Sequence, residues 1–536
     1  MKRYEKYVNA KTFWLTFLGL MLLKYGYYGF RYYPVIDDWI QYGGYRLYDN
    51  IFRDVVIEMK LYAARPLANL SDPYIWGRFW GVMGIVFFII TMMHALSAYF
   101  LYKVFEDNRM PLGISFLIVF GLLPLGTEAT YWISASARVV VGTFFMALSL
   151  FLLNLYIKRE KNIYLWTFFI TNLASMGYYE QVIVLSFFGV LLLLAVNWRA
   201  IKHKWIVSLP CINFFAIAMY YKAFSKIGNV AVRGEFVKSN FIKHTMLVLD
   251  EVTDVFGQVH IPFYTNGFPR GMDVLLSNDS YIFLLLLLLF SFAAAVFAYK
   301  DKNIGSIKIN IFKIVVGFVL FWVPFGPNFL LELVWICIRN AFTSFIGLAL
   351  IIDGVLGIFF RGKIGTLLKG LGVFIATFVF LVVNVSEIAD YKNVSEADQK
   401  MSANIIAAVK DPGFLEGKKS VIIFNTKSSY IEQNYYFRDH IHNVSSSDWA
   451  LTGGVRGIAR NEKILYLRPV SDGEKAKINK EVWDTYIIMG MKDDLSVFPL
   501  NIQKQANGDV QLFAKDGRLF GTAYMEDKDK YIFKKE

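Results

Sequence analysis

Long apolar runs recur along the first three quarters of the chain and constrain its fold more than any other feature. Each is about 15 to 22 residues long, close to the length that crosses roughly 30 Å of hydrocarbon as a helix. We count about eleven such runs, approximately at residues 11–30, 81–101, 112–125, 139–156, 163–176, 182–196, 205–221, 281–298, 311–325, 341–360 and 367–385. Hydrophobic residues make up 56% of the 536-residue chain and aromatic residues 17%, well above what a soluble chain of this size carries. The sequence therefore predicts an all-α polytopic membrane domain.

Basic residues predict how this domain is oriented. They gather before the first run and in alternate later loops, at Lys2, Arg3, Lys6, Lys11, Lys158, Arg159, Lys161, Arg199, Lys202, Lys204, Lys300, Lys302, Lys308, Arg361 and Lys363. Short cytoplasmic loops hold an excess of Lys and Arg, so the N-terminus is expected in the cytoplasm. The first run carries Lys24 and lacks a small-residue cleavage site, so it is expected to remain as a helix. An odd number of spans places the C-terminus outside.

The chain changes character after residue 385, where apolar runs shorten to strand length. The segments 418–426, 462–470, 484–491 and 508–525 have the pattern of strands, and 396–410 that of a helix. From Ile388 onward the chain has 22 Lys and Arg against 21 Asp and Glu, so nearly all of the formal net charge of +13 lies before it. That excess is the positive-inside signature and does not predict nucleic-acid binding. We expect a membrane domain over residues 1–387 and an extracellular α+β domain over 388–536.

Composition also suggests where the protein is found. Cys211 and Cys337 are the only cysteines, and both lie in or beside apolar runs, so no disulfide framework is implied. A Lys-rich, Cys-poor membrane protein fits a bacterial plasma membrane.

Two loops on the predicted outer side are long, 31–80 and 224–280. In the first, Ile51, Val55, Met59 and Tyr62 recur at helical spacing with charged residues between them, which predicts a helix lying on the membrane surface. In the second, a similar amphipathic helix is expected to end near Gly257, followed by a Pro- and Gly-containing loop.

An acidic pair opens the first long loop, in the stretch YYPVIDDWIQYGG. Carboxylates are costly to desolvate beside a membrane, yet Asp37 and Asp38 stand among aromatic residues there. A carboxylate just outside a bilayer can accept the proton of a sugar hydroxyl, so both are candidates for a catalytic general base. They could equally be solvated loop acids, or one could cap the segment that follows.

The arrangement resembles the GT-C class of polytopic glycosyltransferases. The resemblance rests on a first span, an outer loop that opens with the acidic pair of "DDW", a surface helix, many further spans and an external C-terminal domain. It implies a polyprenyl-phosphate sugar as donor, and bacterial enzymes that modify cell-surface polysaccharide or teichoic acid are the nearest in pattern. The acceptor would then be an extracytoplasmic glycan or a lipid-linked molecule. The chain has no Gly-rich phosphate loop for a nucleotide sugar, in keeping with such a donor.

A polyprenyl-phosphate donor sets simple chemical requirements. Its phosphate is already a good leaving group, so the site needs a base for the acceptor hydroxyl and cations for the phosphate. Direct displacement would invert the anomeric centre. Four arginines map to outer loops or outer helix ends and are candidates to bind the phosphate, namely Arg65, Arg138, Arg233 and Arg339. Each could instead be a headgroup anchor at the membrane surface.

Other polar and aromatic residues share the predicted outer face. Glu128 and Glu180 occupy very short turns between apolar runs, where they could bind the sugar, orient an arginine or form structural ion pairs. Tyr131 and Tyr179 beside them could stack on a sugar, although aromatic residues are also common at membrane interfaces. No metal site or cofactor is predicted, and a divalent cation bound by the acidic pair is left open.

The leading hypothesis is therefore a membrane hexosyltransferase. A transporter or flippase is the alternative, since polar residues among spans also mark substrate paths. A membrane-anchored binding protein, with the C-terminal domain as its working part, is the third reading.

Overall fold

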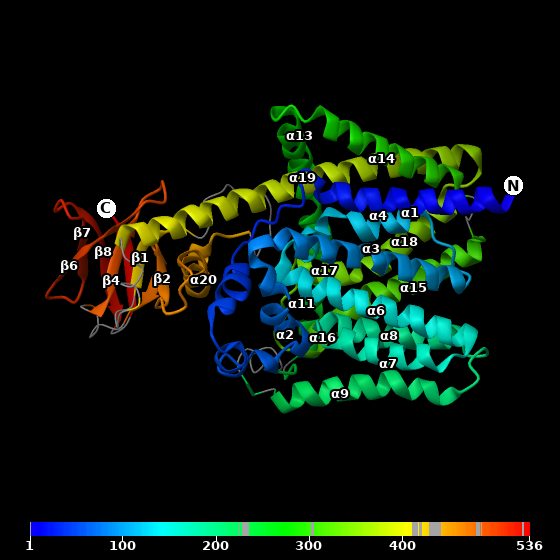
Figure 1. Cartoon of the computed structure of the whole chain (residues 1–536), viewed down its shortest axis with the longest axis horizontal. Helices are drawn as coiled ribbons and strands as arrows, with labels where there is room; N and C mark the ends of the chain where they lie inside the picture. The colour runs from blue at the N-terminus through cyan, green and yellow to red at the C-terminus, as the bar shows by residue number, and fades with distance from the viewer. Residues whose placement is uncertain are drawn as a thin grey trace.

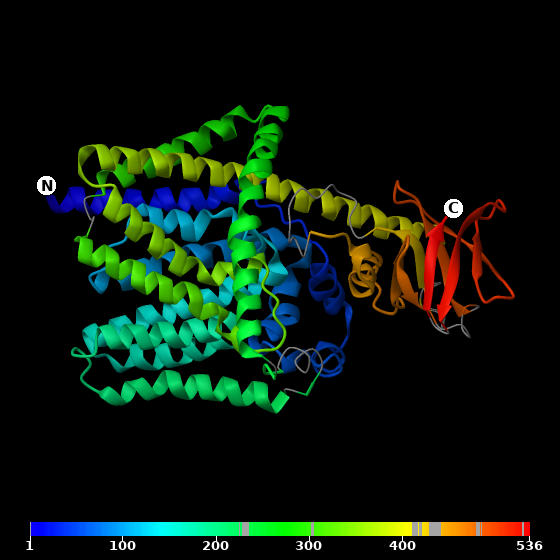
Figure 2. The same cartoon turned by 180° about the vertical axis from the view of Figure 1, so that it is seen from behind.

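The chain folds into a bundle of long helices from which a strand-rich domain projects (Figure 1). The computed structural model describes residues 2–224, 226–227, 235–238, 240–301, 305–409, 416, 421–427, 441–478, 483, 485–527 and 530–536, with side chains from residue 10 onward. The N-terminus lies at the end of the bundle farthest from the strand-rich domain (Figures 1 and 2). A mostly helical chain with a strand-rich C-terminal domain confirms the coarse prediction of fold class.

Every predicted apolar run coincides with a helix of the bundle. These helices are α1 (Lys2–Gly26), α3 (Met83–Asp107), α4 (Ile114–Leu122), α6 (Ile133–Arg159), α7 (Asn162–Met176), α8 (Glu180–Val196), α9 (Ser208–Phe224), α14 (Tyr281–Lys300), α15 (Ile307–Trp322), α18 (Phe345–Phe359) and α19 (Gly362–Val409). Within the described residues, seven helices are long and apolar enough to cross a membrane, or eight if one bent pair is a single span. Helices such as α7 and α8 have only 15 and 17 residues, so the count of eleven spans stays a prediction.

The bent pair is a helix that is interrupted within the bundle. The helix α4 ends at Leu122, and after η6 (Pro124–Gly126) the short helix α5 (Thr127–Tyr131) continues at an angle of 43°. A break inside an apolar bundle leaves backbone carbonyls without partners, and these must be satisfied locally. Three side chains from other helices lie against them.

Each of the three side chains comes from a different helix. The Lys24 ammonium of α1 donates to the carbonyl of Gly121, and the Asn384 amide of α19 donates to that of Leu122, both at 3.2 Å. The imidazole Nε2 of His94, on α3, lies 3.2 Å from the carbonyl of Phe120. The break is therefore built into the fold, and it sets the direction of α5, which carries Glu128.

The first long loop is helical but broken more often than its sequence pattern predicts. It contains the short turns η1 (Trp39–Gly44), η2 (Tyr45–Leu47), η3 (Ile51–Ile57), η4 (Leu61–Ala63) and η5 (Trp76–Val82), together with α2 (Pro66–Tyr74). The single surface helix expected over residues 51–62 is interrupted because Lys60 adopts a left-handed conformation. Arg65, also left-handed at φ +48°, then redirects the chain into α2.

The second long loop is more helical than predicted. It runs through α11 (Phe241–Thr253), η8 (Asp254–Gln258), α12 (His260–Pro262), η9 (Phe263–Gly267) and α13 (Phe268–Ser277), without the loop expected after Gly257. Pro269 is tolerated because it lies in the first turn of α13, where a backbone N–H has no helical partner. This stretch lies across the spans near the end from which the C-terminal domain projects (Figure 2). The short helices α16 (Gly326–Leu330) and α17 (Ile338–Ala341) precede α18.

The C-terminal domain has three layers. One sheet has the order β2-β1-β4-β5, with β1 (Val421–Thr426) parallel to both β2 (Leu467–Ser471) and β4 (Ile487–Met491), and β5 (Val497–Pro499) antiparallel to β4. The helix α20 (Asp448–Ala459) connects β1 to β2. A second, antiparallel sheet has the order β3-β9-β8-β7-β6, with strands β3 (Lys475–Lys477), β6 (Asn501–Lys504), β7 (Val510–Phe513), β8 (Leu519–Asp527) and β9 (Lys530–Lys535).

The strand β1 is buried on both faces, which explains its unbroken apolar sequence. Val421 and Ile423 pack in the core against α19 and α20, whereas Ile422 and Phe424 pack in the core beneath the second sheet. All four predicted strand segments contain strands, but the parallel order around β1 and the helix α20 were not anticipated.

The helix α19 connects the two parts without interruption. It has 48 residues, which at 1.5 Å per residue makes it about 70 Å long. The predicted boundary between residues 387 and 388 falls inside it, and the separate helix expected at 396–410 is its continuation. A continuous helix is stiffer than a linker, so the C-terminal domain is held in place beyond one end of the bundle (Figure 1).

Candidate functional site

The acidic pair sits in a strained turn at the end of the bundle that faces the C-terminal domain. Ile36, directly before the pair, has φ +38°, a conformation that β-branched residues rarely adopt. Strain of this kind persists only where the surroundings enforce it, and it gathers at functional sites. The two acids that follow have different surroundings.

Asp38 is completely buried and is held from four directions. One carboxylate oxygen accepts the Tyr32 hydroxyl at 2.5 Å and the Val35 N–H at 3.1 Å. The other accepts the N–H of Ser134 at 3.1 Å and its hydroxyl at 2.6 Å. Burial raises the pKa of the Asp38 carboxyl to about 7, against the lowering effect of these hydrogen bonds. Because Ser134 is the second residue of α6, Asp38 caps that helix.

Asp37 is half-buried and contacts the C-terminal domain instead of α6. Its Oδ1 accepts a hydrogen bond of 2.9 Å from the indole N–H of Trp449, in the C-terminal domain. It also lies near Asp72, whose pKa is raised mainly by burial and further by the Asp37 charge, against the lowering effect of Arg138. Asp37 is therefore the acid of the pair that combines partial exposure with a polar neighbourhood.

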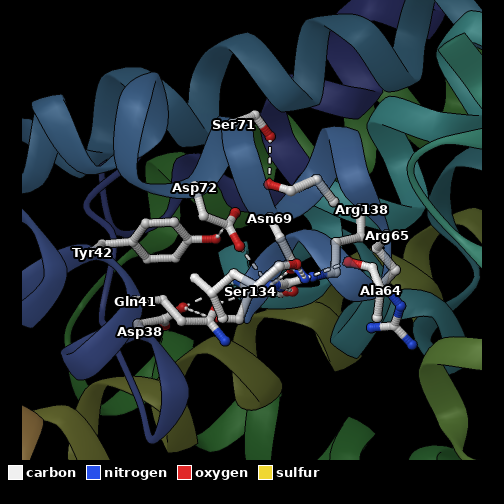
Figure 3. A network of polar contacts seen from close by, with 12 residues as sticks. Asp38, Gln41, Tyr42, Ala64, Arg65, Asn69, Ser71, Asp72, Ser134 and Arg138 are labelled. Atoms are coloured by element: carbon white, nitrogen blue, oxygen red, sulfur yellow. Dashed lines mark hydrogen bonds and ion pairs between the residues drawn. The ribbon is translucent and has the colours of Figure 1, made fainter. Parts of the chain in front are cut away.

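Arg138 forms the centre of a buried polar network (Figure 3). Its guanidinium pairs with the Asp72 carboxylate at 2.5 Å, and both side chains are less than a tenth exposed. Asp72 also accepts the Tyr42 hydroxyl at 3.0 Å, and Arg138 donates to the side-chain oxygens of Gln41 at 3.2 Å and Asn69 at 3.4 Å. The network joins η1, α2 and α6. Arg138 is thus a buried residue with a charged partner, and it does not act as an anchor to lipid headgroups.

Arg65 lies next to this network at the start of α2. Its Nε is 2.9 Å from both oxygens of Glu180, the first residue of α8, and its guanidinium stacks on the Tyr179 ring at 4.6 Å. The amide of Asn69 donates to the carbonyls of Leu61 and Ala64 and so supports the left-handed turn at Arg65. About a fifth of the Arg65 side chain remains exposed.

Arg339 is the third arginine of the candidate site. It lies on α17, 3.2 Å from Glu128, and stacks on the rings of Trp335 at 4.6 Å and Trp132 at 5.4 Å. The Tyr179 hydroxyl donates to the Asn340 side chain at 2.5 Å, so the same tyrosine contacts Arg65 and the neighbour of Arg339. The two glutamates predicted in short turns are thus each paired with a predicted arginine.

The remaining predicted residues are placed less centrally. Tyr131 is buried against Tyr391, Tyr32 and Phe87, and its hydroxyl donates to the carbonyl of Arg31, so it packs inside the core beside Asp38. Arg233 lies outside the described residues. In the part of the chain that the structure describes, no three His, Cys, Asp or Glu side chains gather as metal ligands, and the divalent cation stays an untested prediction.

Asp72 and Trp449 were missed from the sequence. Asp72 follows Arg65 by seven residues, two helical turns, so periodicity around α2 could have placed the two on one face. Trp449 gave no such signal, because it comes from a domain more than 400 positions away.

Comparisons with known proteins add no further constraint. The chain matches no protein-family model, and no curated protein shows significant similarity to it.

Proposed function

We propose that the protein is a membrane glycosyltransferase of the GT-C type. It transfers one sugar from a polyprenyl-phosphate donor to a cell-surface glycan or teichoic acid acceptor outside the cytoplasm. The observation that carries the proposal is the half-buried Asp37 near the Arg138–Asp72 ion pair, at one end of a bundle of apolar helices. An amphiphilic donor needs this combination, because its tail partitions into lipid and its phosphate requires cations.

The two aspartates have different roles in this scheme. Asp38 has its oxygens occupied by four donors, so it holds the turn and caps α6. Asp37 accepts one hydrogen bond, from Trp449, among the described residues and keeps acceptor capacity for a substrate hydroxyl. Asp37 is therefore the proposed base.

The arginines divide in a similar way. Arg138 is buried and committed to Asp72, so it supports the site from beneath. Arg65 is more exposed, and its hydrogen bonds to Glu180 come from Nε. Among the described residues, no hydrogen bond is found for its two Nη groups. Two such nitrogens match the oxygens of a phosphate. Arg65 and Arg339 are the proposed phosphate ligands, held by Glu180, Glu128 and the ring of Tyr179.

The reaction is a single displacement. The acceptor hydroxyl gives its proton to Asp37 while its oxygen bonds to C1 of the sugar. The bond between C1 and the phosphate oxygen breaks at the same time, and its electron pair leaves with the phosphate, which Arg65 and Arg339 stabilise. Attack opposite the leaving group inverts the anomeric centre.

A transfer assay in detergent tests the proposal, with a panel of polyprenyl-phosphate hexoses and glycan or teichoic acid acceptors. We expect Asp37→Asn to lower turnover by about 10²–10⁴ without loss of folded protein, because a general base contributes about that much. Asp49→Asn, an exposed acid on the same loop, is the matched control and should leave turnover unchanged. Full turnover by Asp37→Asn would remove the proposal.

A transporter is the second candidate, and one observation favours it. Two ion pairs involve buried lysines of the bundle. Lys313 pairs with the buried Asp353, and Lys369 pairs with Asp301, a partly exposed residue at the end of α14. Charged residues among membrane helices often mark a substrate path. The detergent assay separates the two functions, because a transporter has no second compartment there and forms no glycosidic bond.

A further inference from the structure

The helix α20 of the C-terminal domain packs directly on the turn that carries the acidic pair. The contact is made through Gly453: a Cβ at this position would lie 2.7 Å from the backbone nitrogen of Ile40, in η1. One turn further along, a Cβ on Gly457 would meet Gly43 at an ordinary distance of 3.8 Å. The absence of a side chain at Gly453 therefore allows α20 to approach η1 this closely.

Polar contacts fix the same interface on several sides. The indole N–H of Trp449 donates to Asp37 at 2.9 Å, and the Arg456 guanidinium donates to the Tyr48 hydroxyl at 3.1 Å. From the loop, the indole N–H of Trp39 donates to Asp398 of α19 at 3.3 Å. Each bond ties a residue of the first loop to α19 or α20.

The turn that carries the acidic pair also packs through apolar side chains against the core of the C-terminal domain. Trp39 is buried within the core formed by α19, α20 and the first sheet, and Ile36 packs against that core. Ile36 is also the residue with the strained backbone, so the domain contacts the turn at the residue whose unfavourable conformation needs support from its surroundings. The conformation of the acidic pair thus depends on two supports, Ser134 in the bundle and α20 outside it.

We propose that Trp449 is a positioning residue for Asp37 and that α20 holds the Asp37 turn in its reactive arrangement. This inference rests on the proposed function. Trp449 remains about half exposed, so its hydrogen bond to Asp37 is not a consequence of burial in a core. Donation to Oδ1 fixes the carboxylate rotamer and leaves Oδ2 to take the proton of the acceptor hydroxyl. The indole neither gains nor loses a proton in the reaction.

Trp449→Phe tests the hydrogen bond, since it removes the N–H and keeps an aromatic ring. We expect kcat to fall about tenfold, the worth of a hydrogen bond to a charged group, with KM for donor and acceptor unchanged. In an Asp37→Asn background the same substitution should have no further effect, because the residue acts through Asp37. Wild-type kcat in Trp449→Phe, or an equal loss in both backgrounds, would overturn the inference.

Two glycine substitutions test the docking of α20. Gly453→Ala forces α20 away from Ile40 and should lower kcat, whereas Gly457→Ala, a matched change on the same helix, should not. Equal kcat in both variants, with both folded, would contradict a role for docking. If wild-type protein transfers no sugar at all, the proposed function itself fails, and that result differs from wild-type activity that ignores Trp449 and Gly453.

Discussion

The carboxylate of Asp38 receives two hydrogen bonds from Ser134, from its backbone N–H at 3.1 Å and its hydroxyl at 2.6 Å. Ser134 lies in the first turn of α6, where backbone N–H groups have no helical partner and a negative charge is favourable. The next turn of α6 carries Arg138, so the contact between Asp38 and Ser134 also fixes the position of that arginine. Asp38 therefore holds the start of α6 in place beside the turn that carries Asp37.

Asp38 makes stability depend on pH. Burial raises the pKa of its carboxyl to about 7, above the value of about 4 for an aspartate in an unfolded chain. The folded protein therefore binds the proton more tightly, and the stabilisation this provides is complete below pH about 4 and lost as pH rises through about 7. We expect the Tm in detergent to fall over this interval more steeply for wild type than for Asp38→Asn, which cannot titrate. Parallel Tm curves for the two proteins would contradict this assignment.

The Arg138–Asp72 pair should be costly to break from one side. Both side chains are buried, so Arg138→Met or Asp72→Leu leaves an uncompensated charge, which typically costs about 3–5 kcal/mol. The double variant should recover much of this loss, because hydrophobic residues often replace a buried pair at little cost. Thermal unfolding of the four proteins gives the coupling energy.

The pair of Arg53 and Asp54 on the same loop is the control for this cycle. Its arginine is largely solvated, so Arg53→Met should change Tm little. Additive losses at Arg138 and Asp72, with no recovery in the double variant, would show that the two side chains stabilise the protein independently.

The helices were predictable because their signal is local. Length and apolar composition identify a run such as 139–156 without reference to any neighbour, and all of the predicted runs are helical. Five residues singled out from the sequence form ion pairs in the structure, and their roles in binding or catalysis stay predictions; they are Arg65, Arg138, Arg339, Glu128 and Glu180. Which arginine pairs with which acid was not predictable, because the partners come from different helices.

Two features escaped prediction because tertiary packing decides them. The stretch that forms α20, DWALTGGVRGIA, contains three glycines, which disfavour a helix locally. The structure explains Gly453 by its contact with Ile40, a relation that no local pattern encodes. Likewise Asp37 and Asp38 are neighbours in sequence, and only the fold separates a buried capping carboxylate from a half-exposed one.

Substituting lysine for each proposed phosphate ligand should separate binding from chemistry. Arg65→Lys keeps the charge but loses the planar group that contacts Glu180, stacks on Tyr179 and presents two further nitrogens. Arg339→Lys loses the stacking on Trp335 and Trp132. We expect KM for a polyprenyl-phosphate donor to rise about tenfold or more in each variant, since bidentate recognition of phosphate is lost.

Inhibition by the free polyprenyl phosphate, which has no sugar to transfer, reports on the same contacts without the reaction. Its inhibition constant should weaken in parallel with KM if Arg65 and Arg339 bind the phosphate. Arg53→Lys, an exposed arginine on the first loop, should leave both constants unchanged. If Arg65→Lys instead lowered kcat and left both KM and the inhibition constant at wild-type values, Arg65 would act on the transition state or on the position of α2, and the phosphate would have to be bound elsewhere.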